Sequence, residues 1–298
     1  MEKSICIQYL YNKTSFLSKF STSHKKGLIT KIIYEIVQKD DTLMPNVDTI
    51  ISLIDVLPDF TKYEKYVEDI INLEEKVEFS VALNNYFRDL RKEIKKEEIT
   101  KNFSNTDLNL ISLELENYIL FKLYDKLYPT KPTKADIDFY NKCISLNFIR
   151  PENLVKNTKI INEKLWKNAI NYINEIDDKF TPVDKLKCLG KAFSILQNSI
   201  TFCSGKDEVG VDDTIPPLLY ILIKSKPKNL ISNYNFCSLF LNSELSKKEY
   251  GILLSQIGLV INVIKDMSYK DFINISEEEY DKRYKDALLS INIENDKK

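Results

Sequence analysis

The scarcity of glycine is the feature of this chain that most restricts its fold. Only six glycines occur among 298 residues, and a large sheet protein needs many more tight turns than six glycines can support. Leucine, isoleucine, lysine and glutamate recur instead at the spacing of helices. The sequence therefore predicts an all-α protein, and its apolar fraction of 43% is enough to build a substantial core.

The charged residues are numerous but balanced. The chain has 43 basic and 44 acidic side chains, so its overall charge gives no strong field of the kind that nucleic-acid binders and polybasic membrane-surface proteins carry. No window reaches the ~18 uninterrupted apolar residues of a membrane-spanning helix, and the first residues lack the apolar segment of a signal peptide. We therefore expect a cytoplasmic protein with no nucleic-acid partner and no direct membrane insertion.

Cysteine and histidine limit the chemistry that the chain can perform. The five cysteines form no CxxC pair and His24 is the only histidine, so we expect free thiols, no metal site and no cofactor. A single histidine also removes His-based triads and His-based acid–base work, although paired carboxylates or a lysine base remain possible in principle. Ordinary hydrolase chemistry is therefore disfavoured.

A proline-containing segment divides the chain. Each proline of Tyr128–Pro132 biases its predecessor away from helical geometry. We expect an N-terminal helical bundle over residues 1–127, a second helical domain over 128–290 and a charged tail at 291–298. In the second domain the apolar helix at 248–267 should lie in the middle. The expected helices beyond the prolines are 135–146, 151–154, 164–175, 182–199, 216–224, 248–267 and 276–290.

Two acids precede one of these helices directly. The segment 205–220 reads GKDEVGVDDTIPPLLY, in which a polar loop leads into the acid pair and then into an apolar helix. In one interpretation, Asp213 or Thr214 caps the helix, and Pro216 lies in the first turn, where its missing N–H is harmless. In the other, the stiff proline pair fixes the direction of Asp212, as insertion into a partner would require.

Several segments, taken in order, resemble the vacuolar protein sorting nine (Vps-nine) domain of Rab exchange factors. Thr181–Leu189 resembles the proline-led helix with a Lys-Leu-x-Cys core. Asp212–Pro216 matches the Asp-Asp-x-x-Pro signature, and Leu230–Asn233 is similar to the Leu-x-Ser-Asn turn. Gly251–Met267 resembles the long apolar helix that closes the match. The resemblance covers roughly residues 110–285, and its specificity lies in the combination and order of these segments.

This resemblance implies a guanine-nucleotide exchange factor. Such a protein would release GDP from an early-endosomal, Rab-five-type GTPase in endocytic vesicle trafficking, without covalent chemistry. It would be cytoplasmic and recruited to early endosomes, and its N-terminal bundle would pack against the exchange domain and stiffen it. By position, Asp212 is the aspartate finger that dislodges the nucleotide. Asp213, Pro216 and Leu219 would contact the GTPase.

A second set of contact residues follows from alignment on Gly251. It places Ile252 where the family has a tyrosine and Ser255 where it has a threonine, with the preceding loop one residue shorter. Tyr250 lies close enough in the chain to compensate if the loop shifts. Both Ile252 and Ser255 could instead be positions on a core helix.

Two alternative functions stay open. The protein could be a Rab-binding module with weak or no exchange activity, because Ile252 lacks the ring and hydroxyl of tyrosine. It could also be a helical scaffold in which Asp212 and Asp213 only cap a helix.

Overall fold

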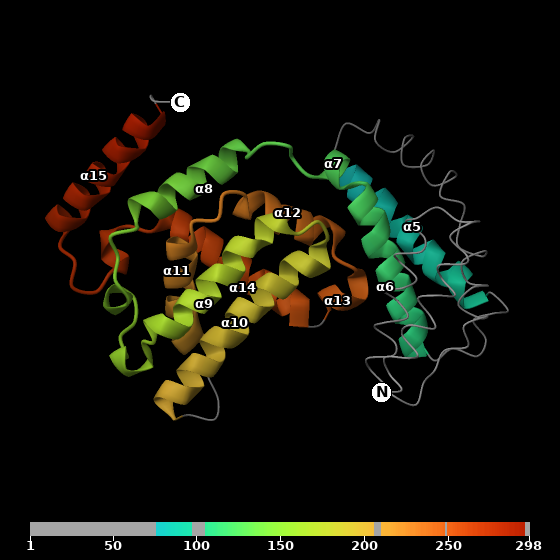
Figure 1. The fold of residues 1–298 in the computed structure, drawn as a ribbon, viewed down its shortest axis with the longest axis horizontal. Coiled ribbons are helices and arrows are strands. Elements are labelled where there is room, and N and C mark those ends of the chain that lie inside the picture. The colour runs from blue at the N-terminus through green and yellow to red at the C-terminus, as the bar shows by residue number, and fades with distance from the viewer. Residues whose placement is uncertain (1–75, 97–104, 206–209, 248, 296–298) are drawn as a thin grey trace, which may run out of the picture. The chain divides into compact units, whose positions relative to one another are not determined.

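The computed structural model describes residues 76–96, 105–205, 210–247 and 249–295, and every regular element in these ranges is a helix (Figure 1). The predicted all-α class is confirmed. Most of the predicted N-terminal bundle, residues 1–75, lies outside the described residues. No helix in the described ranges is long and apolar enough to cross a membrane.

The chain divides into two compact units, residues 1–123 and 124–298. In the first unit, α5 (Lys76–Lys96) packs against α6 (Asn105–Lys122). Across their contact, Arg91 Nε of α5 donates to the carboxylate of buried Glu116 on α6 at 2.6 Å. The buried apolar side chains of the pair are Phe79, Leu83, Phe87, Leu90, Leu108, Ile119 and Leu120.

The second unit contains every predicted site residue. Its elements are α7 (Tyr124–Leu127), α8 (Lys134–Ser145), η2 (Pro151–Asn153), η3 (Thr158–Ile160), α9 (Glu163–Asn174), η4 (Glu175–Asp178), α10 (Pro182–Ser204), α11 (Val211–Ser225), α12 (Leu230–Phe240), α13 (Ser243–Ser246), α14 (Glu249–Asp266), η5 (Tyr269–Asp271) and α15 (Glu277–Asn295).

Helix α10 is the central element of this unit. Thr181 caps it by accepting a hydrogen bond from Asp184 N, Pro182 occupies the first turn, and Gly205 ends it with a φ of 66°. The helix packs against α9, α11, α12 and α14. Along its apolar stripe Leu186, Leu189, Leu196 and Ile200 are buried, whereas Phe193 is half-buried.

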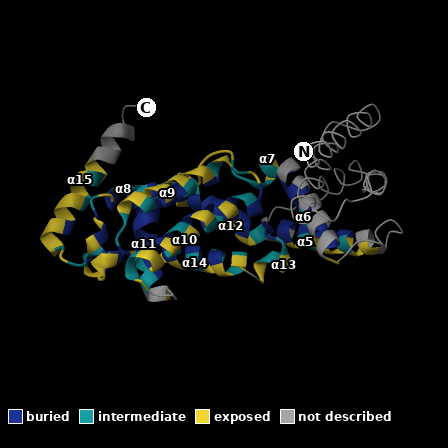
Figure 2. Ribbon diagram, turned by 60° about the horizontal axis from the view of Figure 1, so that its bottom comes forward, coloured by how far each residue is buried: buried dark blue, intermediate teal, exposed yellow. Residues whose placement is uncertain are grey.

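Helices α11 and α14 lie beside α10 and pack against each other. The middle of α11 is almost fully enclosed, and Ile221, Leu222 and Ile223 have no exposed surface. Figure 2 shows buried residues concentrated along these central helices, with the exposed ones on the outside. Burial of each such aliphatic side chain contributes about 1.5–3 kcal/mol. The interior of the domain therefore holds α11 rigidly from Leu218 onward.

Candidate functional site

The acid pair lies within the first turn of α11 rather than before it. The helix begins at Val211, with Gly210 at its N-cap and no side-chain cap. The predicted start at Pro216, with Asp213 or Thr214 as the cap, was therefore wrong. Thr214 is instead a buried helical residue whose Oγ1 donates to Gly210 O at 2.8 Å. This internal hydrogen bond ties the first turn together without a capping side chain.

The two prolines lie inside α11 as a result of this earlier start. Neither Pro216 nor Pro217 has an N–H to donate, so the carbonyls of Asp212 and Asp213, four residues before them, receive no helical hydrogen bond from these positions. The helix tolerates this loss because the apolar turns that follow are buried. Asp212 is the second residue of the helix, and Asp213 is half-buried. Carboxylates are favoured at this end by the helix dipole.

Helix α14 offers an exposed ridge, which we define as Ile252, Ser255 and Leu259. Their spacing of three and four residues places them on one helical face. Ile252 is 64% exposed and Leu259 50% exposed, and Ser255 is also exposed. The Ser255 hydroxyl donates to Gly251 O at 2.9 Å. Helix α14 packs against α8, α10, α11, α12 and α13, as expected for a helix in the middle of the domain, but it is not enclosed all round, because this face stays exposed.

Gly251 fixes how α14 begins. A Cβ atom at this position would overlap the backbone carbonyl of Ser246 at the end of α13. Only glycine allows the two helices to approach this closely. On the neighbouring turn, Leu253 is buried and its Cδ2 would lie 3.7 Å from a Cβ built at Gly190 of α10. The position of Ile252 on the surface therefore follows from close packing on both sides of it.

Two other predicted contact residues of α11 are less accessible. Pro216 is half-buried, and Leu219 is buried with 6% of its surface exposed. The Leu219 side chain supports the helix from inside and offers little surface to a partner. Of the predicted contact residues, Ile252 and Ser255 on the α14 ridge are exposed, and α14 packs against α11, the helix that carries the acid pair.

The Leu-x-Ser-Asn segment has a structural role between helices. Its hydrogen-bond partners are side chains from other parts of the chain. Both the amide and the hydroxyl of Ser232 donate to the carboxylate of buried Asp136. The side chain of Asn233 donates from Nδ2 to Asp177 Oδ1 at 2.7 Å, and its Oδ1 accepts from Tyr128 Oη at 2.8 Å. These contacts join α12 to α8, to η4 and to Tyr128, which directly follows α7.

A buried lysine completes this polar network, and the sequence reasoning did not single it out. Lys185 has no exposed surface. Its Nζ donates to Ile176 O at 3.2 Å and to Tyr124 Oη at 3.3 Å, and it lies 4.7 Å from the centre of the Tyr128 ring. Burial lowers the pKa of Lys185 to about 8. The signal was present in the sequence, since Lys185 occupies the same stripe as Leu189 and Leu196.

Burial also changes the pKa values of the two tyrosines beside Lys185, in this case by raising them. Desolvation raises the pKa of Tyr124 to about 12, and it raises the pKa of Tyr128 further. The two rings stack at 4.7 Å between centres. Both phenols therefore remain neutral donors and acceptors at physiological pH, and they shield the Lys185 ammonium from water.

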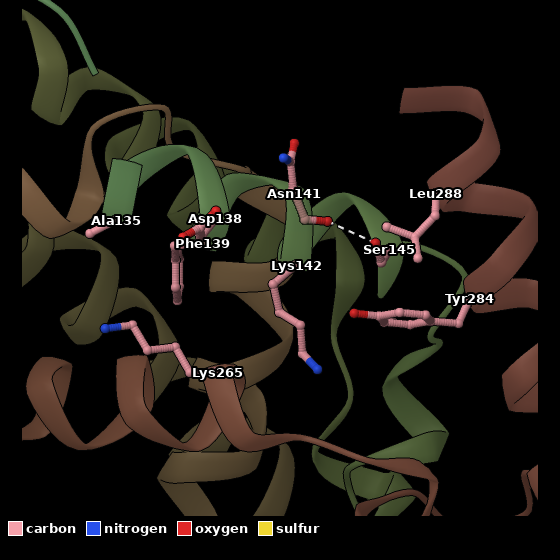
Figure 3. Close-up of a pocket in the computed structure, with 9 residues that line it drawn as sticks. All are labelled: Ala135, Asp138, Phe139, Asn141, Lys142, Ser145, Lys265, Tyr284 and Leu288. Carbon is pink, nitrogen blue, oxygen red and sulfur yellow. Dashed lines mark hydrogen bonds between the residues drawn. The ribbon is translucent and has the colours of Figure 1, made fainter. Parts of the chain in front are cut away.

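A cavity of about 450 Å³ lies elsewhere, between α8, α14 and α15 (Figure 3). Lys142 extends from α8 toward it, and its Nζ donates to Met267 O at 2.7 Å. Tyr284 and Leu288 of α15 close the other side. No predicted site residue lines this cavity. Among the described residues, no three His, Cys, Asp or Glu side chains are grouped so that they could hold a metal ion.

The comparisons with known proteins match the part of the chain that carries these features. Residues 166–269 match the Vacuolar sorting protein 9 (VPS9) domain family. The chain contains a VPS9 domain. The predicted family is thus confirmed, and the matched residues include α10, α11 and α14, with both the acid pair and the α14 ridge.

Three relatives show how far the similarity of this chain extends. The chain is 27% identical over 179 residues to the Rab5 GDP/GTP exchange factor of Bos taurus, covering 57% of this chain and 35% of that protein. It is 30% identical over 136 residues to Vacuolar protein sorting-associated protein 9A of Oryza sativa, covering 44% and 28%. It is 24% identical over 178 residues to Receptor-mediated endocytosis protein 6 of Caenorhabditis elegans, covering 56% and 16%. The chain therefore spans about a third or less of the length of these relatives.

Proposed function

We propose that this VPS9 domain promotes release of GDP from a Rab GTPase of the Rab5 type. The observation that carries the proposal is that the acid pair in the first turn of α11 and the exposed ridge of α14 lie on two helices that pack against each other, both within the residues that match the family. The name of the relative from Bos taurus, a Rab5 GDP/GTP exchange factor, supports the choice of partner.

The proposed action of Asp212 is electrostatic. A Rab GTPase holds its nucleotide through P-loop amides, a P-loop lysine and a magnesium ion on the β- and γ-phosphates. A carboxylate inserted beside that lysine offers it a competing charge-assisted hydrogen bond and repels the phosphate. The same negative charge disturbs the magnesium site. The nucleotide-free complex becomes more stable relative to the nucleotide-bound one, and dissociation of GDP is accelerated.

The α14 ridge supplies the apolar part of the proposed contact. Ile252 and Leu259 are more exposed than most aliphatic side chains of this domain. Burying such a side chain against a partner contributes about 1.5–3 kcal/mol. The ridge would hold the switch regions of the GTPase open while Asp212 acts. The Ser255 hydroxyl already donates to Gly251 O, so it would serve the partner as an acceptor.

The reaction changes no covalent bond. Exchange runs toward GTP because GTP is supplied in excess, and incoming nucleotide displaces the exchange factor. We place the activity in the cytoplasm and at early endosomes, which is supported by the relative named for receptor-mediated endocytosis. We also assign the exchange domain to residues 128–290, with residues 1–127 as a supporting bundle and 291–298 as a charged tail.

The test is release of a fluorescent GDP analogue from a panel of Rab GTPases. Wild type should accelerate release from a Rab5-type member. Asp212→Ala should reduce that acceleration by about tenfold to a hundredfold, the range expected when one hydrogen bond to a charged group is lost. Glu278→Ala is the matched control, because Glu278 is an exposed acid in the first turn of α15. It should leave the rate unchanged.

The same assay separates the alternative functions. Ile252→Tyr restores the ring and hydroxyl at the ridge, and we expect it to strengthen binding of the nucleotide-free GTPase. A wild-type chain that binds a Rab without faster GDP release would establish a binding module instead. If no Rab binds, and Asp212→Ala changes only the melting temperature, the chain is a scaffold.

A further inference from the structure

Lysines gather on one surface of the second unit, from the loop before η3 to the outer face of α9. Lys156, Lys159, Lys164 and Lys167 are all exposed. Residues 150–167 contain five basic and two acidic side chains, which gives a local charge of +3, whereas the whole chain has a net charge of −1. The overall balance of the sequence therefore conceals a cationic segment, which we define as Lys156–Lys167.

The lysine charges of this segment are not neutralised by the domain itself. Within the described ranges, none of the four lysines forms an ion pair with a carboxylate. The acid next to Lys164, Glu163, instead accepts a hydrogen bond from Tyr220 Oη of α11 at 3.4 Å. Because Trp166 on α9 is fully buried, Lys164 and Lys167 lie on the opposite, solvent-facing side of the helix.

An exposed aromatic side chain adjoins the cationic segment. The last turn of α10 lies against it, since α10 packs on η3 and Asn162 Nδ2 donates to Cys203 Sγ at 3.9 Å. Figure 1 shows the end of α10 close to the start of α9. Phe202, next to Cys203, is 83% exposed, more than any other large apolar side chain among the described residues. A phenylalanine this exposed beside several lysines offers apolar surface to a binding partner.

We propose that the cationic segment and Phe202 form a peripheral docking surface for the anionic face of a lipid bilayer. Each lysine near an anionic bilayer strengthens binding by about fivefold at moderate salt. An aromatic ring beside such lysines partitions into the boundary between headgroups and acyl chains. The contact lies in the plane of the interface, and no helix crosses the membrane.

The chemistry of the surface favours a bilayer over an acidic protein. Its charges are lysine ammonium groups, which act as mobile point charges suited to scattered headgroups, rather than the planar guanidinium forks that recognise one fixed carboxylate. None of the residues that line the described cavity belongs to the segment or is Phe202. A fluid bilayer requires no complementary shape, whereas a protein partner does.

The experiment is cosedimentation with vesicles, which needs no GTPase and so does not depend on the proposed exchange activity. The full chain is mixed with vesicles of phosphatidylcholine alone or of phosphatidylcholine and phosphatidylserine in equal parts. We expect binding only to the mixed vesicles, weakening as salt is raised. Replacing all four lysines by glutamine should reduce partitioning by a hundredfold or more, which is on the order expected from the contribution of each lysine. Phe202→Ala should reduce it by about tenfold.

Matched controls separate this surface from general effects. Lys282→Gln with Lys285→Gln removes two exposed lysines from α15, and Leu289→Ala removes an apolar side chain that is 60% exposed. Both should bind vesicles as the wild type does. Circular dichroism melts should show the same transition for all variants, because the replaced side chains lie on the surface.

A fluorescence reporter gives a second measurement. Trp166 is the only tryptophan and is fully buried, so Phe202→Trp adds one exposed indole against a constant background. Its emission should shift to shorter wavelength on addition of the mixed vesicles. Equal binding of the wild type and the four-lysine variant would overturn the proposal. So would an indole that responds to a soluble GTPase but not to vesicles, because that surface would then belong to a protein partner.

Discussion

Replacing Lys185 by methionine should change how stability depends on pH. This lysine is fully buried, and burial lowers its pKa from 10.5 to about 8 in the folded protein. Since the unfolded chain keeps the ordinary value, the unfolded state binds more protons between the two values. Stability from this group therefore increases as pH rises from about 8 to about 10.5. Below pH 8 the buried ammonium costs the folded state about 3 kcal/mol relative to neutral lysine.

Other buried groups act in the opposite direction at alkaline pH. Burial raises the pKa of Cys143 and Cys237 to about 12 from an ordinary value of 9, so their contribution to stability is lost as pH rises above 9. The wild-type curve alone therefore cannot isolate the lysine. The difference between wild type and Lys185→Met cancels these groups up to about pH 9.5, because both folded proteins keep the two thiols protonated there. Loss of the Lys185 charge, which lowers the pKa of Cys237, only raises that pKa further.

Urea unfolding at about pH 7 and about pH 9.5 measures that difference. Relative to Lys185→Met, the wild type should gain about 2 kcal/mol in unfolding free energy between the two conditions. Lys191→Met, an exposed lysine of the same helix, should follow the wild type at both pH values. If Lys185→Met showed the same pH dependence as the wild type, the ammonium would not be desolvated and the reasoning would be refuted.

Two further predictions concern how the helices are joined. Asp136→Ala leaves the Ser232 amide and hydroxyl without their acceptor, so it should lower the unfolding free energy by about 2–4 kcal/mol, whereas Asp138→Ala, exposed on the same helix, should change it little in urea titrations. Gly251→Ala places a methyl group against the Ser246 carbonyl and should destabilise the protein by about 2 kcal/mol. In thermal melts, Gly210→Ala should be tolerated, since a Cβ there meets no atom within 4 Å.

The sequence identified the helical class and the family, but it misplaced the start of α11. Proline was assigned to the first turn because its missing N–H is harmless there. In the folded domain, burial of the following turns holds the helix despite both prolines, and the helix begins at Val211. Local propensity rules describe an isolated helix, whereas burial in the core stabilises this helix despite the hydrogen bonds lost at its two prolines.

The sequence by itself determined the fold class and the family, because helix periodicity and motif order are local properties of the chain. Only the tertiary structure decided which face of α14 meets the core, since the sequence does not show whether an apolar residue such as Ile252 is buried or exposed. It also decided that Leu219 is buried and that Lys185 is fully enclosed. Burial depends on what packs against a residue from distant parts of the chain, and no local pattern contains that information.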